Sequence, residues 1–217
     1  MRLAPEGWPF LLAGWSLVAL GGWAAARWGG WVWVVEAALV LVATWLVVFF
    51  RDPVRTGPRG DDLVLAPADG KVVAIGAAEE PAYLKGSATR VSIFMNVFDV
   101  HVNRYPASGE VELVSYNPGK FLHAAGDKAS LDNEQASVGI RTARGPVLVR
   151  QIAGLVARRI VTDARPGTGA RQGERMGMIR FGSRVDVFLP SGAHPRVRVR
   201  VGERVAAGRT VLAEYGP

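Results

Sequence analysis

Two apolar runs near the N-terminus constrain this chain more than any other feature. Residues 8–26 read WPFLLAGWSLVALGGWAAA and carry no charge, and residues 31–50 read WVWVVEAALVLVATWLVVFF, with Glu36 as their one charge. Each run reaches the roughly 20 residues that a helix needs to cross a bilayer core, and both are apolar on all faces. Because the link Arg27–Gly30 is short, we expect residues 1–50 to form a transmembrane helical hairpin.

The competing interpretations of these runs are a cleavable signal peptide and a buried helical pair of a soluble domain. The charged segment before the first run is thin and a second run follows at once, which disfavours the signal peptide. We expect Glu36, near one end of its span, to reach the lipid headgroups. Basic residues flank the hairpin on the side of both termini (Arg2, Arg51, Arg55 and Arg59). This bias predicts a cytoplasmic (inner) membrane protein with its main domain on the cytosolic side.

The remainder of the chain is basic. Residues 51–60 are rich in Pro, Gly and Arg and indicate a juxtamembrane linker. The net charge of +7 belongs entirely to the chain from residue 51 onward, because the first 50 residues hold two basic and two acidic side chains. Such a surface suits an anionic bilayer. Nucleic acid is disfavoured, since neither stacking aromatics nor a recognition helix is evident.

Residues 61–217 predict a β-rich domain. Short runs of β-forming residues alternate with Gly, Pro and Asp. The expected strands are Leu63–Leu65, Lys71–Ile75, Arg90–Asn96, Gly109–Ser115, Ser137–Thr142, Val147–Ile152, Leu155–Val161, Arg180–Leu189 and Arg196–Val201, with helical turns near Tyr83 and over Lys128–Glu134. The fold class is therefore mainly β, a sandwich or distorted barrel. The segments 67–73 and 201–208 resemble the half-motifs of biotinyl/lipoyl-like hammerhead folds, without the Met-Lys-Met turn of a carrier.

Several common chemistries lack their residues. The chain has no cysteine, which excludes disulfides, thiolate metal sites and a cysteine nucleophile. Its histidines are His101, His123 and His194, and no spacing typical of a zinc site is present. Neither a phosphate-binding P-loop nor a GxSxG nucleophile elbow occurs. We therefore expect no metal.

One strand places a serine on the core side. In the segment MIRFGSRVDVFLP, residues 178–190, Ser183 alternates in phase with five apolar side chains. Gly182 before it allows backbone bending, which suits attack by the serine hydroxyl on the preceding carbonyl. The simpler interpretation is a buried serine bonded to backbone, and the residues alone favour it.

Several blocks, in order, resemble the phosphatidylserine decarboxylases of the short, archaeal-like, membrane-hairpin type. They are FFRDPVR (49–55), APADGKV (66–72), FMNVFDVHVNRYPASG (94–109), PGKFLHAAGDKASLDNE (118–134), QIAGLVARRIV (151–161) and RFGSRVDVFLP (180–190). The resemblance implies self-cleavage between Gly182 and Ser183 into a β chain, 1–182, and an α chain, 183–217, which stay together as a heterodimer. Ser183 would become a covalent pyruvoyl cofactor, whose Schiff base with phosphatidylserine leads to phosphatidylethanolamine and CO2.

The resemblance also implies roles for individual residues. Asp69 matches the acidic member of a processing relay, although an Asp-Gly turn explains it equally. His101 matches the histidine that moves protons. Longer members carry a second histidine where this chain has Arg104, so either His101 serves both processing and decarboxylation, or processing depends less on a general base. Arg180 and Arg184 are candidate phosphate ligands, with a solvated basic strand edge as the alternative.

Other expectations concern partners and rival functions. Asp99 could orient His101. Exposed edge strands make further dimerisation reasonable. The rival function is a non-enzymatic membrane adaptor with a hammerhead-like domain, which would usually carry coiled-coil heptads that this chain lacks.

Overall fold

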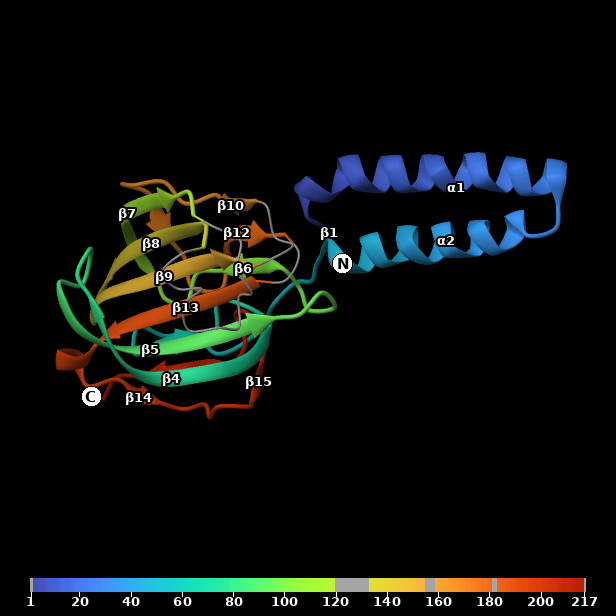
Figure 1. Ribbon diagram of the computed structural model, residues 1–217. Coiled ribbons are helices and arrows are strands. Elements are labelled where there is room, and N and C mark those ends of the chain that lie inside the picture. Colours follow the sequence, from blue (N-terminus) through green and yellow to red (C-terminus); the bar gives the residue numbers. More distant parts are fainter. Residues whose placement is uncertain (1, 120–132, 155–158, 181–182, 217) are drawn as a thin grey trace. The chain divides into compact units, whose positions relative to one another are not determined.

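The computed structural model describes residues 2–119, 133–154, 159–180 and 183–216. The chain divides into two compact units, one ending at Val54 and the other beginning at Arg55 (Figure 1). Gly182 and His123 lie outside the described residues.

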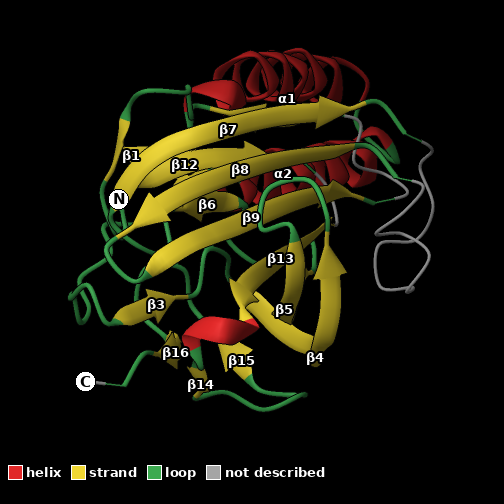
Figure 2. Cartoon of the chain, turned by 90° about the vertical axis from the view of Figure 1, so that its left-hand side faces the viewer, coloured by secondary structure: helices red, strands yellow, loops and turns green. Residues whose placement is uncertain are grey.

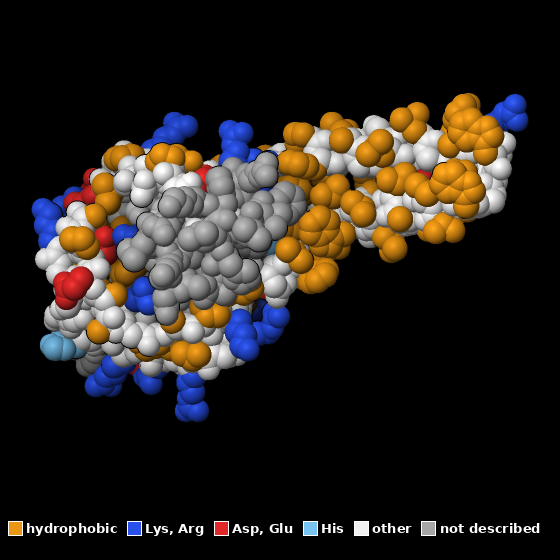
Figure 3. Space-filling view, in the orientation of Figure 1, with side chains coloured by type: hydrophobic (Ala, Val, Ile, Leu, Met, Phe, Trp, Pro, Cys, Tyr) orange, Lys and Arg blue, Asp and Glu red, His pale blue; other side chains and the backbone are white. Residues whose placement is uncertain are grey.

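The first unit is a pair of apolar helices. Strand β1 (Arg2–Leu3) and a short 3-10 helix (Pro5–Gly7) precede α1 (Trp8–Trp28), and α2 (Val32–Phe49) is followed by β2 (Arg51–Asp52), which pairs with β1. Gly29 and Gly30, with φ of 64° and 59°, turn the chain between the helices. By length and composition both helices could cross a membrane, and Figure 3 shows hydrophobic side chains along them.

Glu36 does not lie where the sequence predicted. Its side chain is 8% exposed and packs inside the hairpin against Gly21 and Gly22 of α1. The absence of a side chain at Gly21 leaves the space that the carboxyl group fills, and a Cβ there would collide with it. The expectation that Glu36 reaches the headgroups was therefore wrong, because inter-helix packing determines its position.

The second unit consists of short strands. These are β3 (Leu63–Leu65), β4 (Gly70–Glu80), β5 (Gly86–Met95), β6 (Val102–Arg104), β7 (Gly109–Asn117), β8 (Gln135–Thr142), β9 (Gly145–Ala153), β10 (Ile160–Thr162), β11 (Gly169–Ala170), β12 (Arg175–Ile179), β13 (Ser183–Pro190), β14 (Arg196–Val197), β15 (Arg204–Val205) and β16 (Val211–Glu214). The predicted mainly β class is confirmed.

Eight strands form one curled antiparallel sheet in the order β11-β7-β8-β9-β13-β5-β4-β15 (Figure 2). Two three-stranded sheets, β10-β12-β6 and β14-β16-β3, complete the unit. The inner face of the curled sheet supplies the main core, in which Val185, Val187 and Leu189 of β13 are fully buried. The period-2 reading of this strand is confirmed.

Three strand predictions need correction at their ends. The expected strand Arg196–Val201 is shorter, because β14 ends at Val197. The expected strand Arg180–Leu189 starts too early, because β12 ends at Ile179 in the sheet that contains β6, whereas β13 begins at Ser183 in the main sheet. The expected strand Leu155–Val161 overlaps residues outside the described part, and β10 begins at Ile160. The helical turn expected over Lys128–Glu134 lies mostly outside the described residues, and Tyr83 lies in the turn between β4 and β5.

The two hammerhead-like segments lie side by side. Ala66 donates its N–H to the Thr210 carbonyl and accepts one from Gly208, both at 2.8 Å. Farther along, β15 pairs with β4 through Arg204 and Lys71. The C-terminal segment thus closes the β4 edge of the main sheet.

Candidate active site

Ser183 is the first residue of the central strand of the main sheet. It lies opposite Met95 of β5 and Ala153 of β9 in the two ladders. Its side chain is fully buried, and its hydroxyl donates to the Met95 sulfur at 3.4 Å. Because β12 ends in a different sheet, the chain changes sheets immediately before Ser183, at a segment that includes the undescribed Gly182.

His101 is held by backbone contacts near that same change of sheets. Its side chain is fully buried, and its Nδ1 lies 3.0 Å from the backbone carbonyl oxygen of Asp99. A carbonyl only accepts, so in the neutral ring Nδ1 carries the hydrogen and Nε2 the lone pair. The His101 carbonyl accepts from Ile179, the last residue of β12, at 3.4 Å.

Asp99 orients His101 through its backbone rather than its carboxylate. One carboxylate oxygen accepts the Asn96 N–H at 2.9 Å, and the other accepts from Arg204 at 3.0 Å. The carboxylate thus closes the turn before His101 and ties it to β15.

Asp69 lies just before β4. Its carboxylate accepts the Ala207 N–H at 2.7 Å and pairs with Arg55 at 2.5 Å. The next residue is Gly70, and a larger residue would not fit there, because a Cβ at this position would collide with the Phe94 carbonyl of β5. These contacts hold Asp69 at the same end of the sheet as Ser183, but they do not join it to His101 or Ser183 in a hydrogen-bonded relay.

A buried amide pair lies beside Ser183 and was not found from the sequence. Gln151 donates from Nε2 to Asn103 Oδ1 at 2.8 Å, and Asn103 Nδ2 lies 3.7 Å from the Met95 sulfur. Both side chains are fully buried. Met95 therefore links the serine hydroxyl to the amide pair, and the signal in the sequence was a glutamine at a core-facing position of a strand.

A comparison with protein families adds an independent finding. Residues 42–213 match the model of the family described as phosphatidylserine decarboxylase. The chain belongs to the phosphatidylserine decarboxylase family. The match covers the second, β-rich unit except its C-terminal end, including Asp69, His101 and Ser183, and it confirms the resemblance inferred from the ordered blocks.

In this decarboxylase family member the guanidinium of Arg184, beside the predicted cleavage site, is already engaged by other side chains. Arg184 is 1% exposed and makes a bidentate pair with Asp186 at 2.6 and 2.9 Å. It also donates to Ser92 at 3.0 Å. Arg184 alternates with Ser183 along β13, so it lies on the opposite face of the sheet. Arg180 is partly buried, and its backbone N–H donates to the Arg159 carbonyl at 3.3 Å. Phosphate binding by Arg180 and Arg184 stays a prediction.

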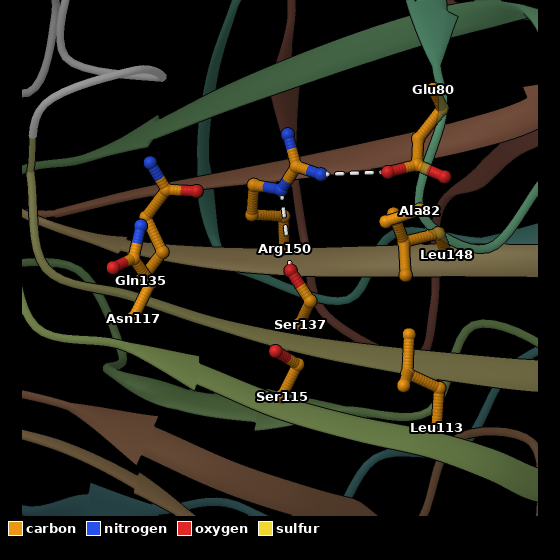
Figure 4. Close-up of a pocket in the computed structure, with 9 residues that line it drawn as sticks. All are labelled: Glu80, Ala82, Leu113, Ser115, Asn117, Gln135, Ser137, Leu148 and Arg150. Carbon is orange, nitrogen blue, oxygen red and sulfur yellow. Dashed lines mark hydrogen bonds and ion pairs between the residues drawn. The ribbon is translucent and has the colours of Figure 1, made fainter.

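A separate cavity of about 240 Å³ lies on the outer face of the main sheet (Figure 4). Arg150 spans it, donating to Glu80 at 2.9 Å and to Ser137 at 3.2 Å. Neither Ser183 nor His101 lines it. Its residues are Glu80, Ala82, Leu113, Ser115, Asn117, Gln135, Ser137, Leu148 and Arg150. Within the described ranges, no group of three His, Asp or Glu side chains could hold a metal ion.

Proposed function

We propose that the chain is a membrane-bound phosphatidylserine decarboxylase that makes its own pyruvoyl group by cleavage between Gly182 and Ser183. The observation that carries this proposal is the position of Ser183 at the start of β13, buried and on the core side, within a chain of this family. The family match favours the enzyme over the membrane adaptor.

The cleavage chemistry needs only atoms of this chain and water. The Ser183 Oγ attacks the Gly182 carbonyl carbon, the peptide C–N bond breaks, and the proton passes to the freed amine. Loss of the Ser183 Cα proton then expels the Gly182 carboxylate and leaves dehydroalanine. Its tautomer takes up water and releases ammonia, which leaves a ketone. The buried surroundings of Ser183 suit this sequence because they limit competing hydrolysis of the ester.

The residues around Ser183 fit a pyruvoyl group on the new chain end. β13 is hydrogen-bonded on both sides, to β5 and to β9, so the α chain 183–217 would remain in the sheet after cleavage. When formed, the ketone supplies an electrophile for the serine amine and withdraws electrons from it. His101, whose ring is held by the Asp99 carbonyl, would be the residue that moves protons during the reaction. Asp69 would act on processing by holding the Ala207 segment.

Membrane attachment follows from the two apolar helices. Phosphatidylserine and phosphatidylethanolamine both stay in the bilayer, and the basic charge of the β unit complements anionic lipid. The arginines that flank the hairpin on the side of both termini support a location of this unit on the cytosolic side of the inner membrane. Further dimerisation stays a prediction, and the edge strands β11 and β15 offer two residues each for it.

Denaturing intact-mass measurement tests the central step. The purified chain is expected as two fragments, 1–182 and 183–217, the shorter with a blocked N-terminus. Ser183→Ala is expected as one uncleaved chain without CO2 release from phosphatidylserine, while Ser191→Ala, in the same fragment, cleaves normally. A single 217-residue wild-type chain with an intact serine would contradict self-cleavage.

A labelling experiment tests the orientation. Because the chain has no cysteine, Trp31→Cys in the helix link and Ser191→Cys in the β unit each introduce one thiol. In intact cells an impermeant maleimide is expected to label position 31 only. Labelling at 191 alone would reverse the orientation.

A further inference from the structure

An apolar tip projects from the turn between β5 and β6. Val97 is 37% exposed and Phe98 is 67% exposed, although both are large and apolar. The turn is ordered by its own polar residues. Asn96 Oδ1 accepts the Phe98 N–H at 2.8 Å, and the Asp99 N–H donates to the Asn96 carbonyl at 3.0 Å. The exposure is therefore built into the turn.

Basic residues adjoin this tip. Arg204 of β15 pairs with Asp99 at 3.0 Å while its side chain is 68% exposed. Lys71, also exposed, lies opposite Arg204 in the β4–β15 ladder. The turn before β15 adds the exposed Arg200 and Val201, the latter 61% exposed. Its one acid, Glu203, accepts the Arg200 N–H at 3.0 Å. We call these residues the tip surface: Lys71, Val97, Phe98, Arg200, Val201 and Arg204.

The tip surface lies at the end of the sheet that holds Ser183. Met95, which is opposite Ser183, precedes Val97 by two residues. His101 follows Phe98 by three residues. A substrate that approaches Ser183 from this end therefore passes close to exposed apolar and basic side chains.

We propose that the tip surface docks the β unit on an anionic phospholipid bilayer, with Val97 and Phe98 at the acyl boundary and the basic side chains at the headgroups. This inference rests on the proposed function. Apolar residues flanked by Lys and Arg are the combination that holds a protein at a lipid interface. Docking reduces how far a phospholipid must move out of the bilayer to reach Ser183. This lowers the energetic cost, because each methylene group exposed to water costs free energy. A protein partner would not require this adjacency to Ser183.

Single introduced cysteines test the contact directly, because the chain has none of its own. An environment-sensitive fluorophore is attached to the cysteine of the full-length Phe98→Cys protein. The labelled protein is reconstituted in vesicles of phosphatidylcholine with about one third phosphatidylglycerol. The matched control is Lys85→Cys, in the turn at the other end of β5. Acyl-chain quenchers in the lipid are expected to quench position 98 and not position 85. Equal and weak quenching at both would overturn the proposal.

Kinetics test its consequence. Phe98→Ser, and separately Lys71→Gln with Arg200→Gln, are expected to raise the apparent KM for phosphatidylserine in these vesicles by about tenfold. Self-cleavage, followed by intact mass, should remain complete. Phe98→Leu should restore the wild-type KM, and Lys85→Gln should not change it. Added salt should raise the KM of the wild type more than that of the Lys71 and Arg200 variant.

The outcomes separate this inference from the proposed function. Wild-type protein that releases no CO2 would contradict the decarboxylase itself. An active wild type with unchanged KM in both tip variants would contradict docking while leaving the enzyme intact. If Phe98→Ser fails to fold, the charge variant and the fluorophore at position 98 still decide the matter.

Discussion

The Ser183 hydroxyl donates to the Met95 sulfur at 3.4 Å across the ladder between β13 and β5. Thioether sulfur is a weak acceptor, so this contact positions the hydroxyl without strongly stabilising it. That arrangement suits a serine that must attack a neighbouring carbonyl. The same sulfur contacts Asn103, so one flexible side chain separates the serine from the buried amide pair.

Substitutions of Met95 should separate packing from hydrogen bonding. Met95→Leu conserves volume and is expected to cost less than about 1.5 kcal/mol, with cleavage retained. Met95→Ala leaves a cavity beside Ser183 and should destabilise the protein by about 2–5 kcal/mol. Denaturant unfolding and intact mass measure the two effects. Loss of cleavage in Met95→Leu, with stability unchanged, would show that the sulfur contact itself is required.

His101→Gln should lower decarboxylation by about 10²–10⁴-fold, the usual contribution of a positioned acid or base. Glutamine retains hydrogen bonding but cannot exchange protons near neutral pH. The assay is CO2 release per cleaved chain, so that a processing defect is counted separately. His194→Gln, at an exposed position, serves as the control. Normal turnover in His101→Gln would show that His101 takes no part in proton transfer during decarboxylation.

Arg184 and Asp186 form a buried ion pair on the outer side of β13, 1% and 0% exposed. Arg184→Met removes the two hydrogen bonds that Arg184 donates to the buried Asp186 carboxylate and should destabilise the fold by about 3–5 kcal/mol. Arg184→Met with Asp186→Leu should recover most of that loss. As a surface comparison, removing the exposed pair Arg171–Glu174 should cost no more than about 1 kcal/mol.

The same variants address the predicted phosphate contact. If Arg184 only stabilises the fold, the folded double variant should act on phosphatidylserine with an unchanged KM. A large rise in KM despite recovered stability would instead support Arg184 as a phosphate ligand.

The sequence predicted local features of this site better than its long-range ones. The alternation along Ser183–Leu189 placed the serine on the core side, because one strand with period 2 carries that information. The pairing of Gln151 with Asn103 depends on β6, in one of the small sheets, lying against β9 of the main sheet, which no local pattern specifies. For the same reason Glu36 was misplaced, since its position depends on a glycine in the other helix.

Asp69 illustrates a further limit. The Asp-Gly pattern and the family resemblance both selected it, yet neither identified its contacts with Arg55 and Ala207. Arg55 comes from the linker, 14 residues before Asp69, and Ala207 comes from the C-terminal segment, 138 residues after it. The break in the chain before Ser183 was also not predicted, since the alternation continues through Arg180 while the chain changes sheets.

Tyr215 should give the protein a distinct alkaline instability. Burial raises the pKa of its phenol to about 12, and its hydroxyl has no hydrogen-bond partner within the described residues. The unfolded phenol ionises near pH 10, so stability should be full below pH 10 and fall as pH rises toward 12. Tyr215→Phe should reduce this loss and be neutral or stabilising at pH 7. Identical pH dependence of unfolding in both proteins would contradict the burial argument.

The packing of the helical hairpin can be tested by cross-linking. A Cβ at Gly14 of α1 would lie 3.8 Å from the Ala43 Cβ of α2, which is the mean Cβ separation in disulfides. Gly14→Cys with Ala43→Cys should therefore form a disulfide on mild oxidation in the membrane. Leu20→Cys with Leu41→Cys should not, because those side chains are 64% and 71% exposed on the hairpin surface. Loss of maleimide labelling after oxidation reports the bond. Because the chain has no cysteine of its own, labelling that persists in the first pair would show that α1 and α2 do not pack through Gly14.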